Sequence, residues 1–229
     1  MYQFLTIMLS TVLLTGCAKS SSISQFQQSL AWIWSIRFIA YSPSGFDPRP
    51  SHRKIPKYQD VLADLHTIRP YFDGLILYSA NQPASDILKA ARVLKFRGIV
   101  LGIWDPADKS ELMLAVKLAK RYHRLVKVIC IGNEGLTFYR YSRKQLKAAF
   151  ALVRSKLPRV PLSTSEPITQ YGDRMLQSLP DIHLPNIHPS FNLGAKAGVK
   201  ESVAWVIERA QSLWKVTGCL LYTSPSPRD

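Results

Sequence analysis

The sequence is poor in the residues that build disulfide scaffolds, metal centres and phosphate-binding loops. Its 229 residues include 3 cysteines and 5 histidines, and none of these stands at the spacing of a metal site or forms a disulfide framework. No glycine-rich dinucleotide-binding turn follows the first predicted strand, where residues 42–46 are Ser-Pro-Ser-Gly-Phe. We therefore expect no metal ion and no cofactor.

Acidic residues are scarce relative to basic ones. The chain has 30 Lys and Arg but 15 Asp and Glu, a formal net charge of +15 at pH 7. Such an excess suits a nucleic acid or a membrane surface. However, the basic clusters lack the interleaved aromatic residues of RNA-binding proteins, and no DNA-binding motif is recognisable. We expect a basic but otherwise ordinary surface and no nucleic-acid partner.

The apolar run at the amino end, residues 4–14, is too short to span a bilayer comfortably. It leads into Leu-Thr-Gly-Cys at residues 14–17, which resembles a bacterial lipobox, where cleavage before the cysteine leaves it free to carry lipid. We predict a signal peptide with lipobox over residues 1–17 and a polar tether over residues 18–35. The protein would then be an exported cell envelope lipoprotein, periplasmic or at the cell surface, anchored to the membrane through lipid on Cys17. A plain signal peptide or a membrane anchor is the alternative.

The carboxyl end, residues 219–229, has no hydrophobic periodicity and matches the translation of a transposon adapter used in sequencing libraries. We expect the natural chain to be cut near Gly218, just where residues 213–218 approach a further strand. A natural Pro/Ser tail is the alternative.

Short β-rich runs alternate with helical patterns along the rest of the chain. Strands are predicted over 36–41, 74–79, 98–104, 126–132, 160–165 and 185–188. Helices are predicted over 58–68, 86–96, 108–124 and 199–214, and one more opens at Ser142. Such alternation indicates a parallel sheet with right-handed crossovers, either an open doubly wound sheet or a closed (β/α)8 barrel.

Polar residues directly after several predicted strands favour the barrel. They are Tyr78, Asp105, Asn133, Glu134, Glu166 and His188. Functional groups at the carboxyl ends of many strands are typical of TIM barrels. We therefore predict the α/β class and a (β/α)8 TIM barrel over residues 36–218, truncated to about six βα units, with the other two beyond the cut.

The strongest local feature is Ile-Gly-Asn-Glu-Gly-Leu at residues 131–136. A glutamate at a barrel mouth, flanked by apolar strand residues, can be desolvated, so the pKa of Glu134 would rise and the carboxyl could donate a proton to a leaving oxygen. Asn133 could hydrogen-bond a sugar hydroxyl beside the reacting carbon. A capping glutamate at a strand–helix turn explains the local sequence equally well.

Further short motifs stand at the predicted strand ends in a fixed order. They are Ile39-Ala40-Tyr41-Ser42-Pro43, Tyr78-Ser79, Gly102-Ile103-Trp104, Gly132-Asn133-Glu134, Thr164-Ser165-Glu166 and Asn186-Ile187-His188-Pro189. This series resembles glycoside hydrolase family 17, in particular its bacterial and fungal β-1,3-glucanase-like branch, over about residues 36–218. The resemblance implies a (β/α)8 barrel, a β-glucan polysaccharide or oligosaccharide as partner, and retaining hydrolysis or transglycosylation of β-1,3 linkages.

The resemblance also implies residue roles. Glu134, which follows Asn133, matches the family's general acid/base, and substrate-binding roles are expected for Tyr41, Tyr78, Trp104, Asn133, Glu166, Asn186 and His188. The family's nucleophilic glutamate lies in a Glu-x-Gly-Trp-Pro type motif at the seventh strand, and this sequence has no such motif. A retaining enzyme needs both carboxyls, roughly 5–5.5 Å apart, so we expect the nucleophile beyond the cut and the printed chain to be inactive.

Some alternatives stay open at this point. Tyr78, Trp104 and His188 also suit core positions, and Glu166 is the best substitute nucleophile in the chain. At the level of function, the alternatives are a non-catalytic glycan-binding barrel and a basic envelope protein that binds polyanions.

Overall fold

The computed structural model describes residues 32–194 and 197–217. The predicted signal peptide with Cys17, the tether up to residue 31 and the 219–229 tail lie outside the described residues. The chain divides into two units, residues 1–35 and 36–229. In the first, Trp32–Ser35 form the short 3-10 helix η1; the second holds the remaining elements. Within the described ranges, no helix is both long enough and apolar enough to cross a membrane.

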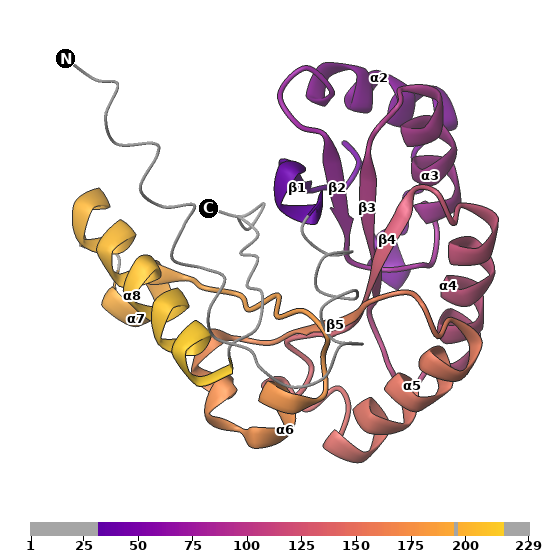
Figure 1. The fold of residues 1–229 in the computed structure, drawn as a ribbon. Coiled ribbons are helices and arrows are strands. Elements are labelled where there is room, and N and C mark those ends of the chain that lie inside the picture. The colour runs from indigo at the N-terminus through magenta and orange to yellow at the C-terminus, as the bar shows by residue number, and fades with distance from the viewer. Residues whose placement is uncertain (1–31, 195–196, 218–229) are drawn as a thin grey trace. The chain divides into compact units, whose positions relative to one another are not determined.

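Five parallel strands form one sheet in the order β1-β2-β3-β4-β5. They are β1 (Phe38–Ala40), β2 (Gly74–Leu77), β3 (Gly98–Ile103), β4 (Val126–Asn133) and β5 (Leu162–Ser165). The helices between them are α2 (Tyr58–Ile68), α3 (Ala84–Val93), α4 (Lys109–Arg121) and α5 (Arg143–Lys156). Right-handed crossovers in one continuous direction place these four helices on one face of the sheet (Figure 1).

This strand order separates the two architectures that the sequence left open. A doubly wound sheet reverses its strand order at a switch point and has helices on both faces, whereas here each strand pairs with the next in sequence. The α/β class and the parallel sheet are confirmed. Closure into an eight-stranded barrel, and truncation of that barrel, stay predictions.

The core lies between the sheet and helices α2–α5. Alternate strand residues point to opposite faces, and the fully buried ones on the helical side are large, namely Leu75, Ile99, Leu101, Ile129 and Ile131. The opposite face is also buried, at Ile76, Val100, Val128 and Cys130. Burial of both faces explains the near-continuous apolar runs of these strands.

Helix starts follow local capping chemistry. Ser142 caps α5: its Oγ accepts from the Gln145 N–H at 3.3 Å, and Gln145 Oε1 accepts from the Ser142 N–H at 2.8 Å. Asp108 caps α4 through the Ser110 N–H at 2.8 Å. Helix α3 begins at Ala84, two residues before the start predicted from the sequence.

The sixth predicted strand, 185–188, does not form. The segment makes one isolated parallel bridge, Pro167 to Asn186, in which the Asn186 N–H donates to the Glu166 carbonyl at 3.0 Å and the Ile168 N–H donates to the Asn186 carbonyl at 2.9 Å. The extended segment still runs beside the carboxyl end of β5.

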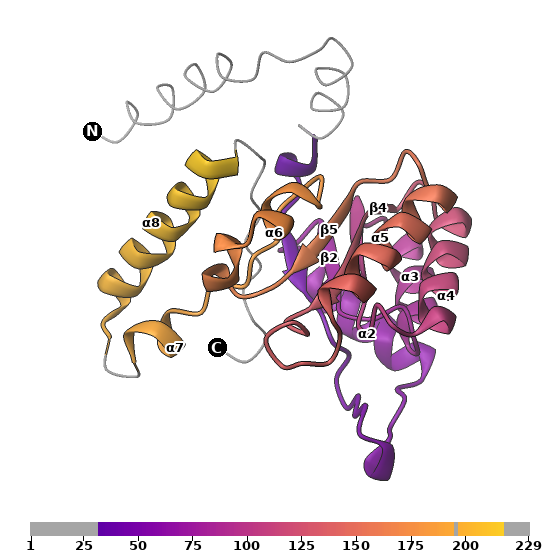
Figure 2. The same cartoon turned by 90° about the horizontal axis from the view of Figure 1, so that it is seen from below.

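Residues 213–217, expected to approach a further strand, belong instead to helix α8 (Val199–Thr217). The apolar spacing that opens this helix continues through Leu213, which is buried. Val203 and Ile207 of this helix are about half exposed. Helix α8 lies on the side of the sheet away from α2–α5 (Figure 2).

Four short elements were not expected from the sequence. They are η2 (Pro50–His52), η3 (Ile168–Gly172), α6 (Arg174–Ser178) and α7 (Pro189–Leu193). Helix α7 packs against α8, and η3 directly follows the end of β5. These last segments complete the surroundings of the candidate site.

Candidate functional site

The site lies where β4 and β5 end. Strand β4 ends at Asn133, and the next residue, Glu134, has a φ of 56°. A residue with a side chain pays roughly 1–2 kcal/mol for this left-handed conformation, and such residues cluster at functional sites. The Glu134 N–H donates to the Ser165 carbonyl of β5 at 2.7 Å, which ties this turn to the neighbouring strand.

Asn186 organises the polar groups around Glu134. Its Nδ2 donates to Glu134 Oε1 at 2.8 Å and to Asn133 Oδ1 at 3.1 Å, while its Oδ1 accepts from Ser165 Oγ at 2.9 Å. Since one side of the amide accepts and the other donates, these contacts fix its orientation. His188 Nε2 lies 3.4 Å from the same Glu134 oxygen and forms an ion pair with it when the imidazole is protonated. The structure thus brings together four residues proposed from sequence.

A pocket of about 270 Å³ opens beside this cluster. Its polar wall includes Glu134, Asn186 and His188. The remaining wall consists of Thr137, Phe138, Pro167, Ile168, Thr169, Phe191 and Asn192. The Glu134 side chain keeps 21% of its surface exposed. The arrangement places a carboxyl group, fixed on one oxygen, where a small ligand can reach it.

Glu166 has a different environment from the one expected. Its side chain has no exposed surface, and its Oε1 accepts from the Tyr141 hydroxyl at 2.6 Å and from the Leu136 N–H at 3.3 Å. Burial raises the pKa of the Glu166 carboxyl, and the nearby charge of Glu134 raises it further, against the hydrogen bonds that lower it. In this structure Glu166 therefore supports the loop after β4 through hydrogen bonds to Leu136 and Tyr141.

Tyr141 packs against the two glycines that flank Asn133 and Glu134. A Cβ on Gly132 would lie 2.1 Å from the Tyr141 hydroxyl oxygen, and one on Gly135 would lie 1.9 Å from the ring atom Cε1. The Gly135 N–H donates to that hydroxyl at 3.2 Å, and burial raises the Tyr141 pKa. The sequence analysis did not identify Tyr141. The glycines on both sides of Asn133-Glu134 indicate that another group packs closely against this turn, and in the structure that group is the Tyr141 ring.

Trp104 and Tyr78 lie at strand ends but outside the wall of this pocket. The Arg140 guanidinium stacks over Trp104, 3.9 Å from the ring centroid, and also donates to the Asn133 carbonyl. Trp104 remains 40% exposed. Arg140, which contacts both Trp104 and Asn133, connects it to the residues around Glu134. Tyr78 is half buried after β2.

Tyr41, for which substrate binding is expected, does not line the pocket beside Glu134. Tyr41 is buried in the core on the helical side, and its hydroxyl donates to Asp64 of α2 at 3.0 Å. Ile39 packs against the same core, and side-chain alternation carries Tyr41 to that face as well. In this position Tyr41 joins the sheet to helix α2.

Glu111 is a buried carboxylate that sequence analysis also missed. It is 1% exposed and accepts hydrogen bonds from the Ala80, Trp104 and Asp105 N–H groups at 3.0–3.1 Å, as well as from the Ser79 hydroxyl. It thereby joins the loops that follow β2 and β3. The Asp-x-x-Glu pattern of residues 108–111 places it in the first helical turn, but nothing local indicates its burial.

Cys130 is the cysteine among the described residues. Cys130 is buried in β4, where burial raises its thiol pKa to about 12. Over residues 32–194 and 197–217, no group of three or more His, Cys, Asp or Glu side chains is arranged to hold a metal ion.

Comparison with known proteins adds a fold likeness. No protein-family model matches the sequence, and no curated protein does. Among solved structures, the chain resembles an endo-laminarinase from Formosa Hel1_33_131 (TM-score 0.65, 15% identity), covering 82% of this chain and 64% of that one. It also resembles the glycoside hydrolase family 17 β-1,3-glucanosyltransferase from Rhizomucor miehei (TM-score 0.67, 15% identity), covering 83% and 70%.

An active-site mutant of the Rhizomucor enzyme in complex with laminaritriose matches similarly, with a TM-score of 0.66 and 14% identity over 83% of this chain and 70% of that one. This chain thus spans less than two thirds of the laminarinase. At such identities the likeness concerns the fold: an α/β arrangement built on a parallel sheet.

Proposed function

We propose that this protein acts on β-1,3-linked glucan as a retaining glycoside hydrolase or transglycosylase, with Glu134 as its general acid/base. The observation that carries the proposal is the Glu134 carboxyl, which lines a pocket at the end of β4 and is held by Asn186 and His188. Support comes from a fold similar to proteins described as an endo-laminarinase and a β-1,3-glucanosyltransferase.

In this proposal the first step is acid assistance. The protonated Glu134 carboxyl donates its proton to the glycosidic oxygen while the bond from that oxygen to the anomeric carbon breaks and the nucleophilic carboxylate bonds to the same carbon. In the second step the Glu134 carboxylate takes a proton from the acceptor, which is water in hydrolysis and a sugar hydroxyl in transglycosylation. The acceptor oxygen then bonds to the anomeric carbon and displaces the nucleophilic carboxylate. Asn133, one residue before, would hydrogen-bond a hydroxyl beside the reacting carbon.

The nucleophile needs a second carboxyl roughly 5–5.5 Å from the first. Among the described residues, Glu134 is the one carboxylate that lines the pocket. Glu166 is fully buried and accepts a hydrogen bond from the Tyr141 hydroxyl. The proposal therefore assigns the nucleophile to a residue outside the described part of the protein.

An activated donor tests Glu134 without that nucleophile. α-Laminaribiosyl fluoride already has the anomeric configuration of the glycosyl-enzyme intermediate, so transfer to an acceptor hydroxyl needs only a base, with fluoride as the leaving group. We expect the chain to transfer laminaribiose to 4-nitrophenyl β-glucoside and Glu134→Gln to lower that rate by about 10²–10⁴-fold. The matched control is Glu201→Gln, an exposed glutamate in the first turn of α8.

Two results would contradict the proposal. Transfer at the wild-type rate in Glu134→Gln would remove Glu134 from the acid/base role. Binding of laminari-oligosaccharides with no transfer by the unaltered chain would instead favour the non-catalytic glycan-binding protein.

The proposal includes export and membrane attachment, supported by the apolar run and lipobox-like residues 14–17. Bacterial cells expressing the chain and fed radiolabelled palmitate should label it. Cys17→Ser should abolish the label, whereas Cys130→Ser should leave it unchanged. Equal labelling of both variants would contradict lipidation at Cys17.

A further inference from the structure

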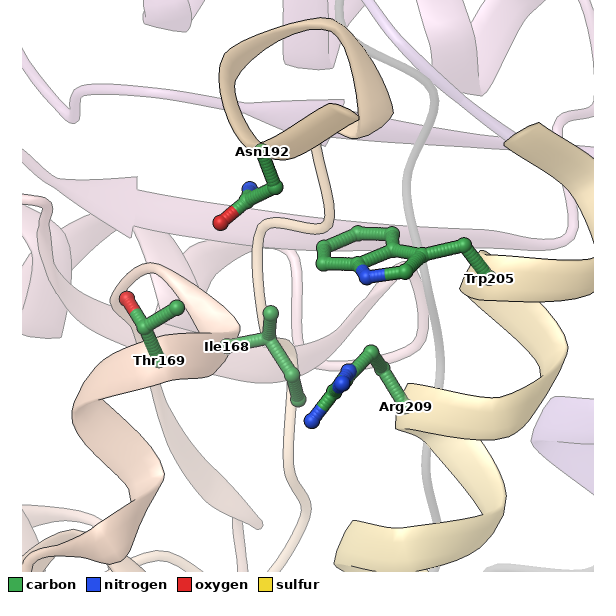
Figure 3. A pocket seen from close by; sticks show the side chains of 5 residues that line it. All are labelled: Ile168, Thr169, Asn192, Trp205 and Arg209. Atoms are coloured by element: carbon green, nitrogen blue, oxygen red, sulfur yellow. The ribbon is translucent and has the colours of Figure 1, made fainter. Parts of the chain in front are cut away.

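A second and larger pocket adjoins the one that contains Glu134. It has a volume of about 430 Å³ and is lined by Ile168, Thr169, Asn192, Trp205 and Arg209 (Figure 3). The first two residues come from η3, Asn192 from α7, and Trp205 and Arg209 from α8. Three separate elements, η3, α7 and α8, thus converge on one cavity.

The two pockets share part of their walls. Ile168, Thr169 and Asn192 line both. The pocket beside Glu134, at about 270 Å³, lies below the range of roughly 300–1,000 Å³ that is common for small-molecule sites. A ligand larger than one sugar unit at Glu134 would therefore continue over the shared wall into the second pocket.

The lining of the second pocket combines an aromatic face with polar groups. The Trp205 indole extends toward Ile168 and Asn192, and the Arg209 side chain reaches into the same space (Figure 3). The Arg209 guanidinium lies 5.7 Å from the Trp205 ring centroid. Asn192 Nδ2 donates to the His188 carbonyl at 3.0 Å, which fixes the amide and links this pocket to the Glu134 cluster.

These groups suit a pyranose ring. The C–H face of a sugar packs on an indole, as other apolar groups pack on aromatic rings, and its hydroxyls pair with hydroxyl, amide and guanidinium groups. Trp205 is partly buried against the core and also lines the cavity. By contrast, Trp214 of the same helix is 45% exposed and is not part of the cavity wall.

We propose that this pocket is a second sugar subsite, which takes a glucose unit of the same β-1,3-glucan chain that reaches Glu134, with Trp205 as its stacking platform. The inference rests on the proposed function and deepens it, because it assigns the site to chains of several units rather than to a disaccharide. Trp205 and Arg209 bind substrate in this scheme and take no part in proton transfer.

Calorimetric titration of the full chain with laminaribiose and laminarihexaose tests the subsite. We expect Trp205→Ala to weaken laminarihexaose binding by roughly tenfold or more, while laminaribiose binding changes by less than about twofold. Trp214→Ala, the matched control on the same helix, should leave both affinities unchanged. Arg209→Ala should weaken the hexaose in the same direction, and it serves as the second variant if Trp205→Ala melts at a lower temperature.

The outcomes separate the subsite from the proposed function. If the unaltered chain binds laminarihexaose and both Trp205→Ala and Arg209→Ala bind it equally well, the subsite is wrong and the proposed function stands. Equal losses for both sugars would also refute the subsite, because it predicts a length-dependent effect. If the unaltered chain binds neither sugar, the proposed function itself fails and this inference fails with it.

Discussion

A buried carboxylate joins the loops after β2 and β3, and another joins the ends of β4 and β5, yet the two regions differ in what else they hold. At the first, Glu111 accepts from three backbone N–H groups and one hydroxyl. At the second, Glu166 supports the loop from below through Tyr141, while Glu134 above it faces a pocket. At the ends of β2 and β3 the carboxylate of Glu111 is used up in holding the loops together. At the ends of β4 and β5 the carboxylate of Glu134 faces a pocket.

The difference shows how a strand-end carboxylate acquires its role. A carboxylate whose lone pairs are taken by backbone donors is a structural anchor and has little capacity left for a ligand. Glu134 has two partners, both on one oxygen, and both are side chains that themselves line the pocket. The loop that carries Glu134 is supported by Glu166 through Tyr141 and Leu136. The ends of β4 and β5 therefore have one carboxylate with a structural role, Glu166, and one that is free to face a ligand, Glu134.

The largest expected effect compares Glu111→Gln with Glu134→Gln in stability. Glu111→Gln turns an amide NH₂ toward backbone donors in a buried site, so we expect a loss of about 3 kcal/mol in the free energy of unfolding. Glu134→Gln keeps a partly exposed oxygen acceptor and should change the free energy by less than about 1 kcal/mol. Urea unfolding followed by circular dichroism measures both.

The two substitutions should therefore separate stability from chemistry. Glu134→Gln is expected to lose glycosyl transfer and keep its stability, whereas Glu111→Gln is expected to lose stability. Equal destabilisation by the two variants would show that the β4–β5 carboxylate is also an anchor, and the contrast between the two strand ends would not hold.

Much of this fold could be predicted because it depends on local patterns. The apolar runs of β2, β3 and β4 and the Ser142 cap of α5 can be recognised from residues that are close together in the sequence. The 185–188 segment makes a single isolated bridge, Pro167 to Asn186, instead of a strand. Residues 213–217 continue a helix because the choice between helix and strand there depends on what the segment packs against.

The site was predictable in part for the same reason. Glu134 and Asn133 could be found from the end of an apolar strand, and Asn186 and His188 from a resemblance. The burial of Glu166 depends on Tyr141, which lies 25 residues away in sequence, and Tyr41 faces the helices because of one step in strand alternation. Such features depend on tertiary packing, which no local pattern of residues records.

A smaller effect is expected from Gly135→Ala, which tests the close packing under Glu134. The added methyl group would lie 1.9 Å from a Tyr141 ring atom, so the ring must move, at a cost of about 1–3 kcal/mol. Gly172→Ala is the control, because a Cβ there meets nothing within 4 Å. Thermal unfolding should separate the two by several degrees; equal melting temperatures would show that the loop yields easily.

The smallest effect concerns pH. Burial holds the folded-state pKa of Glu166 above its unfolded value, so the stability that this group contributes is present at low pH and is lost as pH rises through the folded pKa. Tyr141→Phe removes a hydrogen bond that lowers this pKa. We expect the variant to be about 1–2 kcal/mol less stable than the wild type at pH 8, where Glu166 is more ionised, and closer to it at pH 5.

Comparing the two proteins at each pH removes the contribution of His183. Burial lowers the His183 pKa to about 4, so both proteins lose stability as pH falls below about 6.5 toward that value. This trend runs opposite to that of Glu166 but is common to the wild type and the variant. A stability difference that stays constant from pH 5 to pH 8 would mean that the Tyr141 hydroxyl serves packing alone, and that the support beneath Glu134 does not depend on the charge of Glu166.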